Sequence, residues 1–239
     1  MESNRGEKDC RFSFDHYRYI LKKAERCDYK ILSCDEYHKN RESLPERYVI
    51  LRHDIEHYPD RAVEFAKIEA EFGFISTYFV RVHAKAYNIF NYKVYYDLKS
   101  IIEMGHEVGL HTEPIDFSRT SGEDPEKVFQ KELEVLRVIL SYPVKGVCPH
   151  VDWTEYNNID FFKHIKLKQF GLHYHTYQSE FFKENFYVSD GQHYYWKNYQ
   201  NGDLLKTKLC PCKIIEKGIP NIYLLTHPMN WFHTEYHLM

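Results

Sequence analysis

The chain of 239 residues lacks any apolar run of about 18 residues or more, which a membrane-spanning helix needs. Its first residues are polar and carry no hydrophobic signal segment. It also lacks a surplus of charge of one sign: the net charge is only −3, and acidic and basic residues are intermixed. This balance argues against a basic surface for nucleic acid or membrane lipids. We therefore expect a cytoplasmic protein with no membrane span and no nucleic-acid partner.

Cysteine pairs and common catalytic signatures are also missing. The six cysteines include no C-x-x-C pair, and Cys210-Pro211-Cys212 is too short for a standard redox pair. In a reducing compartment we expect all six to be thiols. The chain has no P-loop, no G-x-G-x-x-G, no G-x-S-x-G and no H-E-x-x-H. Phosphate cradling, hydride transfer and serine hydrolysis therefore have no support.

Aromatic and histidine side chains are abundant instead, with 21 Tyr, 16 Phe and 15 His. Tyr and Trp combine an apolar face with a polar edge, which suits a cleft that stacks on sugar rings. The alternative is that the aromatic residues simply fill the core. Composition alone leaves both interpretations open.

Short apolar runs alternate with amphipathic stretches along most of the chain. Helical spacing of apolar residues predicts helices over 14–24, 59–72, 95–104 and 125–140, and a less distinct one over 159–165. Apolar runs predict strands over 29–32, 48–51, 76–82, 107–110, 144–147 and 222–225, and extended chain over 172–177 and 186–188. This alternation predicts a largely parallel sheet, either a barrel or doubly wound. The length suits one domain, residues 1–239, with residues 1–11 as a flexible tail.

Two carboxylates follow the buried strand predicted over 48–51. Asp54 stands where this strand would emerge, and Glu56 would share its face if the strand continued. In parallel α/β architectures the carboxyl ends of strands form the active face. One acid could hold a metal ion while the other takes a proton from water. For the flanking His57 we favour a surface or ion-paired role.

Histidines stand at the ends of other predicted strands. His111 ends the strand 107–110, and His150 and His227 each terminate or follow an apolar run. Neutral imidazole is the commonest protein ligand for metals such as zinc. His106 would lie about 15 Å away at the other end of its strand, so we expect it to be structural. The pattern favours a metal-binding, hydrolytic site where several strand ends converge.

The motifs resemble those of the NodB-type polysaccharide deacetylases over nearly the whole chain. Residues 51–56 (LRHDIE), a helix, and residues 76–79 (STYF) are similar to the first motif and second strand of that family. Residues 105–112 (GHEVGLHT) resemble the second motif, and residues 224–228 (LLTHP) the last. The most similar subgroup is the divergent bacterial branch found in surface-polysaccharide clusters, often labelled WbmS-like.

This resemblance implies a distorted (β/α) barrel of about seven parallel strands and a divalent metal ion, usually zinc. In the family, one carboxylate and two histidines hold the metal, a carboxylate acts as the base, and a late histidine protonates the leaving amine. Carried onto this chain, the resemblance makes Asp54 the base and His227 the acid. Glu56 could replace the metal-binding acid if Ile55 is an insertion, and His111 matches the first metal histidine.

The chain departs from the family pattern in two places. The second metal histidine normally falls four residues after the first, where this chain has Ile115. Glu113, Asp116 or His150 could take its place. The arginine-containing third motif is not recognisable, and residues 146–150 stand there instead.

The sequence therefore predicts a metal-dependent deacetylase or amidohydrolase that removes an acyl group from an N-acetylated sugar. Its substrate would be a carbohydrate or a nucleotide- or lipid-linked sugar precursor in surface-polysaccharide metabolism. One alternative is a non-catalytic carbohydrate-binding protein on a degenerate barrel, and another is a hydrolase of a different amide. The expected metal ligands are Glu56, His111 and His150. The expected substrate-binding residues are Glu113, Asp190, Trp196 and Trp231.

Overall fold

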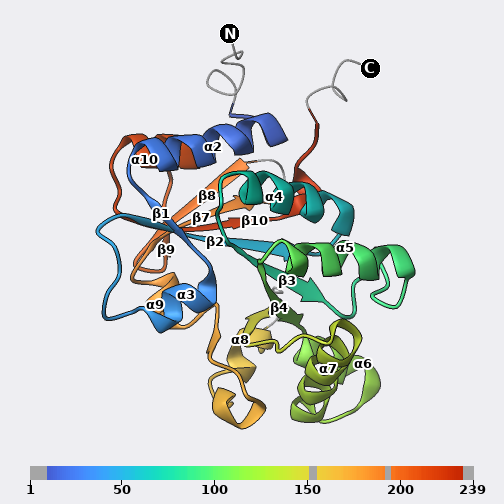
Figure 1. Ribbon diagram of the computed structural model, residues 1–239. Coiled ribbons are helices and arrows are strands. Elements are labelled where there is room, and N and C mark those ends of the chain that lie inside the picture. Colours follow the sequence, from blue (N-terminus) through green and yellow to red (C-terminus); the bar gives the residue numbers. More distant parts are fainter. Residues whose placement is uncertain (1–9, 151–154, 192–194, 234–239) are drawn as a thin grey trace.

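A mostly parallel sheet of ten strands forms the centre of the computed structural model, which describes residues 10–150, 155–191 and 195–233 (Figure 1). The strands lie in the order β6-β5-β4-β3-β2-β10-β7-β8-β9, and β1 pairs with β2 beside this path. Their bounds are β1 (Lys30–Leu32), β2 (Tyr48–Ile55), β3 (Thr77–Arg81), β4 (Glu107–Thr112), β5 (Gly146–Pro149), β6 (Tyr174–His175), β7 (Phe186–Gly191), β8 (Tyr195–Gln200), β9 (Asp203–Leu204) and β10 (Asn221–Thr226).

Seven neighbouring strands, from β6 to β7 in this order, pair in parallel. The remaining edge, β7-β8-β9, is antiparallel. In the part of the chain that the structure describes, the outermost strands β6 and β9 do not pair with each other, so the barrel is not closed. The expected α/β fold, a distorted barrel of about seven parallel strands, is confirmed.

Helices cover the outside of the sheet. In Figure 1, α10, α2 and α4 lie along one side of it, and α5, α7 and α6 continue around the β3 and β4 end. Within residues 10–150, 155–191 and 195–233, none of the helices combines the length and the apolar character that a membrane span needs. The helices are α2 (Phe14–Arg26), α3 (Cys34–Lys39), α4 (Pro59–Glu71), α5 (Tyr92–Glu103), α6 (Pro114–Ser121), α7 (Pro125–Leu140), α8 (Asn158–Phe161), α9 (Ser179–Phe182) and α10 (Pro211–Glu216), with 3-10 turns at Leu167–Phe170 and Pro228–Asn230.

Local sequence signals set the clearest helix ends. The Asp124 side chain accepts hydrogen bonds from the N–H groups of Glu126 and Lys127, and Pro125 fills the first position of α7, where no N–H is needed. Ser13 caps α2 through its side chain. Of the expected tail, residues 1–9 lie outside the described residues, and α2 begins only three residues after Arg11.

Two strands extend beyond the apolar runs that predicted them. β2 continues to Ile55 and β4 to Thr112, so Asp54 and His111 lie within strands, where Asp54 pairs with Phe79 and His111 with Cys148. Polar side chains can occupy these buried positions because each finds a charged or hydrogen-bonding partner there. The extension fixes the direction in which both side chains point.

The Glu69 carboxylate joins the helix layer to the sheet. Glu69 lies on α4 and is fully buried. It accepts hydrogen bonds from the hydroxyls of Tyr17, Ser76 and Tyr78, and its Oε1 lies 2.7 Å from Nε2 of His53. Groups from α2, from β2 and from the start of β3 thus meet at one carboxylate. This convergence holds α4 in place against the strands that carry the site.

We expect Glu69→Gln to destabilise the protein in a pH-dependent way. Burial alone would raise the pKa of Glu69, but His53 and the hydrogen-bond donors lower it to about 2 from its usual 4.5. The ionised carboxylate therefore stabilises the fold fully above pH 4.5, and this contribution is lost as the pH falls toward 2. At pH 7 the variant should lose about 2 kcal/mol, because buried donors lose an ionised acceptor. Urea unfolding at several pH values measures the loss and its decline below pH 4.5.

Glu71→Gln on the same helix is the matched control, because Glu71 is exposed and pairs with Arg18 at the surface. It should change the free energy of unfolding by no more than about 0.5 kcal/mol. An equal loss in both variants, or a loss in Glu69→Gln that does not depend on pH, would contradict the account.

Candidate active site

A cavity of about 360 Å³ lies at the carboxyl ends of the parallel strands. This is the edge at which parallel α/β sheets bind their ligands. Its walls combine carboxylates and imidazoles with aromatic rings, a mixture that is typical of small-molecule sites. The lining residues are Asp54, Glu56, His111, Pro149, Ile159, Tyr177, Phe182, Tyr187, Ser189, Asp190, Gly191, Lys197, Tyr199, Leu225 and His227.

Asp54 is held by an arginine two residues earlier on the same strand. The guanidinium of Arg52 donates from Nε to Oδ1 at 2.8 Å and from Nη2 to Oδ2 at 2.6 Å. Both side chains are buried, with 1% and 3% of their surfaces exposed. Burial alone would raise the pKa of Asp54, but the charges of Arg52 and His111 lower it below its usual value. Asp54 is therefore an oriented and ionised carboxylate.

Aromatic rings surround the Arg52 guanidinium and complete its burial. Its Nη1 donates to the hydroxyl of Tyr223 at 3.0 Å, and the ring centroids of Phe79 and Tyr177 lie 5.5 and 5.3 Å from its central carbon. Such rings stabilise a cation through their negative faces. Arg52 is thus fixed on one side by rings and on the other by Asp54.

Glu56 faces two histidines across the mouth of the cavity. Its Oε1 lies 3.7 Å from Nε2 of His111 and 3.6 Å from Nε2 of His150. Burial would raise the pKa of Glu56, but the hydrogen bond with His111 and the charges of the nearby histidines lower it to about 2. Glu56 is therefore ionised at neutral pH, with two imidazole nitrogens near the same oxygen.

Each of the two histidines presents Nε2 to this point. Nδ1 of His111 lies 3.0 Å from the carbonyl oxygen of Cys148, and a hydrogen bond there directs Nε2 toward the carboxylates. Burial, together with the charges of His111 and Arg81, lowers the pKa of His150 to about 4, so His150 is neutral at pH 7. Neutral imidazole is the form that binds metals.

These donors fit a divalent metal ion. Glu56, His111 and His150 each place a ligand atom within 4.8 Å of the others. One carboxylate oxygen and two imidazole nitrogens are a common donor set of catalytic zinc, which leaves a position open for substrate or water. Two overlapping groups, Asp54 with His111 and Cys148, and Glu113 with Asp116 and His150, share these histidines.

The position that the family pattern reserves for a second metal histidine is closed to metal here. Ile115 has only 4% of its surface exposed and belongs to the apolar core. Of the three replacements that the sequence left open, His150 lies with Glu56 and His111. Glu113 forms an ion pair with Arg81 instead, which reduces its availability as a ligand or as a substrate contact.

The opposite wall carries a second pair of side chains. Nδ1 of His227 lies 2.6 Å from Oδ1 of Asp190, whose Oδ2 also accepts a hydrogen bond from Nε1 of Trp231 at 2.8 Å. Burial would lower the pKa of His227, but Asp190, with smaller contributions from Asp54 and Glu56, raises it to about 9. His227 is therefore a proton donor at neutral pH.

The two tryptophans proposed as substrate contacts lie in the core and are not among the lining residues. Trp231 is fully buried and Trp196 has 4% of its surface exposed, and both pack against Phe12. Trp231 acts on the cavity through its hydrogen bond to Asp190. Four other rings, which the sequence did not single out, line the cavity: Tyr177, Phe182, Tyr187 and Tyr199.

Comparison with known proteins gives matches in structure only. No protein-family model matches the chain, and no curated protein matches its sequence. It is similar to the Streptococcus pyogenes deacetylase PplD in complex with acetate, with a TM-score of 0.52 and 12% identity over 86% of each chain. A Streptococcus mutans CE4 esterase gives a TM-score of 0.49 and 15% identity, over 86% of this chain and 82% of that chain. The likeness to PplD shows a shared fold.

We expect Glu56→Gln to weaken Mn²⁺ binding strongly. Mn²⁺ prefers oxygen and nitrogen donors to thiolates, so it reports on this cavity rather than on cysteine clusters. Because second-shell changes alone cost about 10–100-fold, loss of a direct carboxylate ligand should cost at least about 100-fold. Electron paramagnetic resonance of free Mn²⁺, titrated with protein, measures the affinity.

His57→Gln is the control, because His57 is adjacent in sequence but does not line the cavity. The Mn²⁺ affinity of the His57→Gln variant should equal that of the unaltered protein. Asp116→Asn tests the overlapping group. If Asp116→Asn removes Mn²⁺ binding and Glu56→Gln leaves it intact, Glu56 is not a ligand.

Proposed function

We propose that this protein is a metal-dependent amidohydrolase that removes an acyl group, most simply acetyl, from an N-acylated sugar. The observation that carries the proposal is the convergence on one cavity of an arginine-held carboxylate, a carboxylate-dihistidine donor set and an Asp190–His227 pair. Amide hydrolysis needs these three functions: a base, an electrophilic centre and an acid for the leaving amine. The fold shared with the deacetylase PplD supports the same reaction class.

In this mechanism Glu56, His111 and His150 would hold the cation. A divalent ion at these ligands supplies Lewis acidity, which polarises an amide carbonyl and makes water more acidic. The Nδ1 contact of His111 with the carbonyl of Cys148 keeps its imidazole oriented toward the ion. Glu56 thus supplies the negative charge for the cation, and His111 and His150 supply the imidazole nitrogens.

Asp54 takes the proton from the attacking water. It is ionised at neutral pH. Oδ1 accepts a hydrogen bond from Nε of Arg52 and keeps a second lone pair for a further proton, whereas Oδ2 accepts from Nη2 of Arg52 and from the thiol of Cys148. Its Oδ2 lies 3.7 Å from Nε2 of His111, beside the proposed ligands. Arg52 acts as the positioning residue for this base.

His227 delivers a proton to the leaving nitrogen. With Nδ1 committed to Asp190, its Nε2–H is the donor that remains for a group in the cavity. Because the pKa of His227 is about 9, the ring is charged throughout the neutral range. Asp190 therefore orients the ring and keeps it protonated.

The substrate class follows from the cavity walls. Tyr177, Tyr187 and Tyr199 offer faces and hydroxyls, which suit a sugar ring with its hydroxyl groups. The amino group of Lys197 adds one positive charge to the lining, which would favour an anionic carrier such as the phosphates of a nucleotide sugar. We therefore propose an N-acetylated sugar, or a nucleotide-linked precursor of one, as the substrate.

Acetate release from N-acetyl sugars and nucleotide-linked N-acetyl sugars tests the proposal. In the metal-loaded protein we expect Asp54→Asn to reduce kcat/KM by about 1,000-fold, because the amide cannot accept the proton. Its Mn²⁺ affinity should remain near that of the unaltered protein, since Asp54 is proposed as base and not as ligand. Asp60→Asn, at the exposed start of α4, is the matched control with unchanged activity.

Sugar binding without acetate release, unaffected by Asp54→Asn, would favour a carbohydrate-binding protein instead. Loss of Mn²⁺ together with activity in Asp54→Asn would make Asp54 a ligand. Either result overturns the assignment of Asp54 as the base.

The pH profile tests the role of His227 separately. As a required acid with a pKa of about 9, it should let activity fall only as the pH rises through that value. Asp190→Asn removes the carboxylate that raises this pKa, so the alkaline limb should move to lower pH. The profile of kcat against pH, measured in both proteins with saturating metal, reveals the shift. An alkaline limb at the same pH in both would exclude His227 as the acid held by Asp190.

A further inference from the structure

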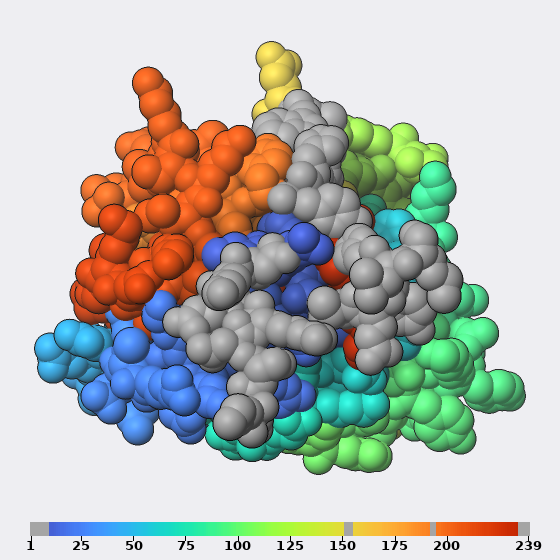
Figure 2. All heavy atoms as spheres, turned by 90° about the horizontal axis from the view of Figure 1, so that it is seen from above, coloured from blue at the N-terminus to red at the C-terminus, as the bar shows by residue number. Residues whose placement is uncertain are grey.

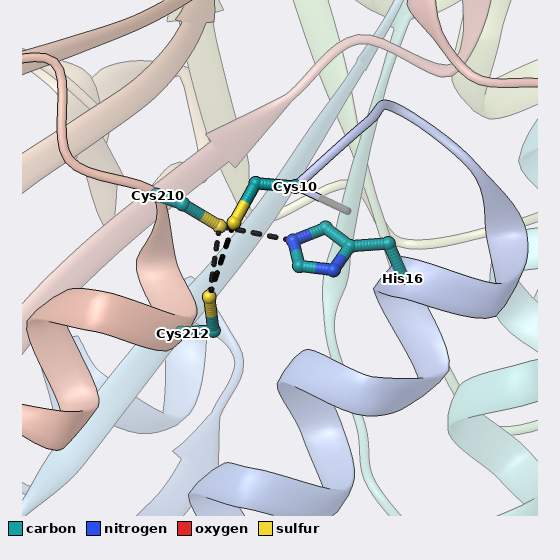
Figure 3. Close-up of side chains that lie close together, drawn as sticks. All are labelled: Cys10, His16, Cys210 and Cys212. Carbon is teal, nitrogen blue, oxygen red and sulfur yellow. Dashed lines mark hydrogen bonds between the residues drawn. The ribbon is translucent and has the colours of Figure 1, made fainter. Parts of the chain in front are cut away.

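Three of the six cysteines meet a histidine between α2 and α10, outside the set of residues that line the cavity. Cys10 lies just before α2 and His16 lies in its first turn, while Cys210 and Cys212 flank Pro211 at the start of α10. Figure 3 shows the three sulfurs and the imidazole of His16 pointing toward one another. The same two chain segments lie side by side in Figure 1 as α2 and α10, and in Figure 2 as blue against orange-red.

The ligand atoms of these four residues are close enough to share one ion. Sγ of Cys210 lies 2.9 Å from Nε2 of His16 and 3.2 Å from Sγ of Cys212, which lies 3.7 Å from Sγ of Cys10. All four atoms lie within 4.8 Å of one another. A tetrahedral zinc site has S–S edges of about 3.8 Å and S–N edges of about 3.5 Å, from its usual bond lengths. Shifts of about 1 Å or less would therefore bring all four atoms to these edges and admit the ion.

The composition and burial of the cluster point to zinc. Three thiolates and one imidazole complete a closed tetrahedral set, which is typical of structural zinc, whereas a catalytic site keeps a position open. His16, Cys210 and Cys212 have 0%, 4% and 2% of their surfaces exposed. Cys10 and Cys212 stand 202 residues apart in the chain, so the cluster joins its two ends. No disulfide competes in the structure, where all six cysteines are free.

We propose that Cys10, His16, Cys210 and Cys212 form a structural zinc site that fastens the segment before α2 to the start of α10. On binding, the three thiols become thiolates and release three protons to solvent, and His16 binds as a neutral imidazole. Zn²⁺ with three thiolates then carries a net charge of −1. No oxidant or reductant is needed. The site is independent of the proposed hydrolysis, because none of its ligands lines the cavity.

Cobalt spectroscopy of the reduced, metal-free protein tests the site directly. Co²⁺ bound by three thiolates gives an intense sulfur-to-cobalt charge-transfer band in the near ultraviolet and strong visible bands of a tetrahedral ion. We expect one equivalent of Co²⁺ to produce these bands and Zn²⁺ to abolish them. Cys10→Ser and Cys212→Ser should weaken the charge-transfer band, and Cys27→Ser, a cysteine at the end of α2, should leave it unchanged.

Cys148→Ser separates this site from the cavity, because Cys148 lies with Asp54 and His111 in a group that could also bind cobalt. The charge-transfer band should persist in Cys148→Ser. If it disappears there and survives in Cys212→Ser, the thiolate belongs to the cavity and the proposal is wrong. A Co²⁺ spectrum without thiolate bands would also overturn it.

Thiol protection provides a test that needs no variant. Cys10 is exposed, so burial does not shield it from an alkylating reagent. In the zinc-loaded protein, peptide mapping should find Cys10, Cys210 and Cys212 unlabelled, and removal of zinc by a chelator should make Cys10 the first of the three to react. Cys27 should react equally in both states. Rapid labelling of Cys10 in the zinc-loaded protein, or a disulfide among the three cysteines in the freshly isolated protein, would contradict the site.

Discussion

The buried ion pair of Arg52 and Asp54 is the interaction around which the interior of the sheet is arranged. Two opposite charges on one strand, almost without exposed surface, are costly to remove from water. A buried ion pair can often be replaced by apolar residues of similar volume with no loss of stability. Stability alone therefore does not explain why this pair lies in the barrel. A functional role for an oriented, ionised carboxylate at the cavity explains it.

The other face of β2 also carries a buried polar side chain, which needs partners of its own. Alternation of side chains turns His53 outward, where Glu69 and Thr226 receive it, while Arg52 and Asp54 turn inward. A register change of one residue would exchange these two sets, which would separate His53 from Glu69 and turn Asp54 away from the cavity. The polar residues of β2 therefore specify its register as firmly as an apolar pattern would. This fixed register is what places Glu56, one residue past the strand, opposite His111 and His150.

Periodicity was enough to predict most of the fold, because each helix and parallel strand carries a local signal. The helix over 125–140 was predicted with its observed ends, since Pro125 marks its start and apolar spacing its length. The antiparallel strand β8 was not predicted, because Tyr195–Gln200 mixes aromatic and polar residues whose pairing with β7 is settled only by tertiary contacts. Periodicity left a barrel and a doubly wound sheet open, and the choice of a distorted barrel came from the resemblance to the deacetylases.

Site residues were predictable to the extent that they stand at strand ends. Asp54, His111 and His227 follow apolar runs, so topology brings them to one edge. The prediction that Trp196 and Trp231 contact substrate relied on their position in the sequence near site residues. In the structure both rings pack in the core. The cysteine and histidine cluster escaped notice because its ligands come from segments about 200 residues apart, beyond any spacing rule. Arg52 carried a usable signal, since a residue two before Asp54 shares its face of the strand.

Anomalous scattering from a crystal soaked in Zn²⁺ locates the metal directly. We expect a peak bonded to Glu56, His111 and His150, with Asp54 beside it but held by Arg52. A peak on Asp54, His111 and Cys148 instead, or no peak at this cavity while zinc is bound elsewhere, would contradict the proposed active site.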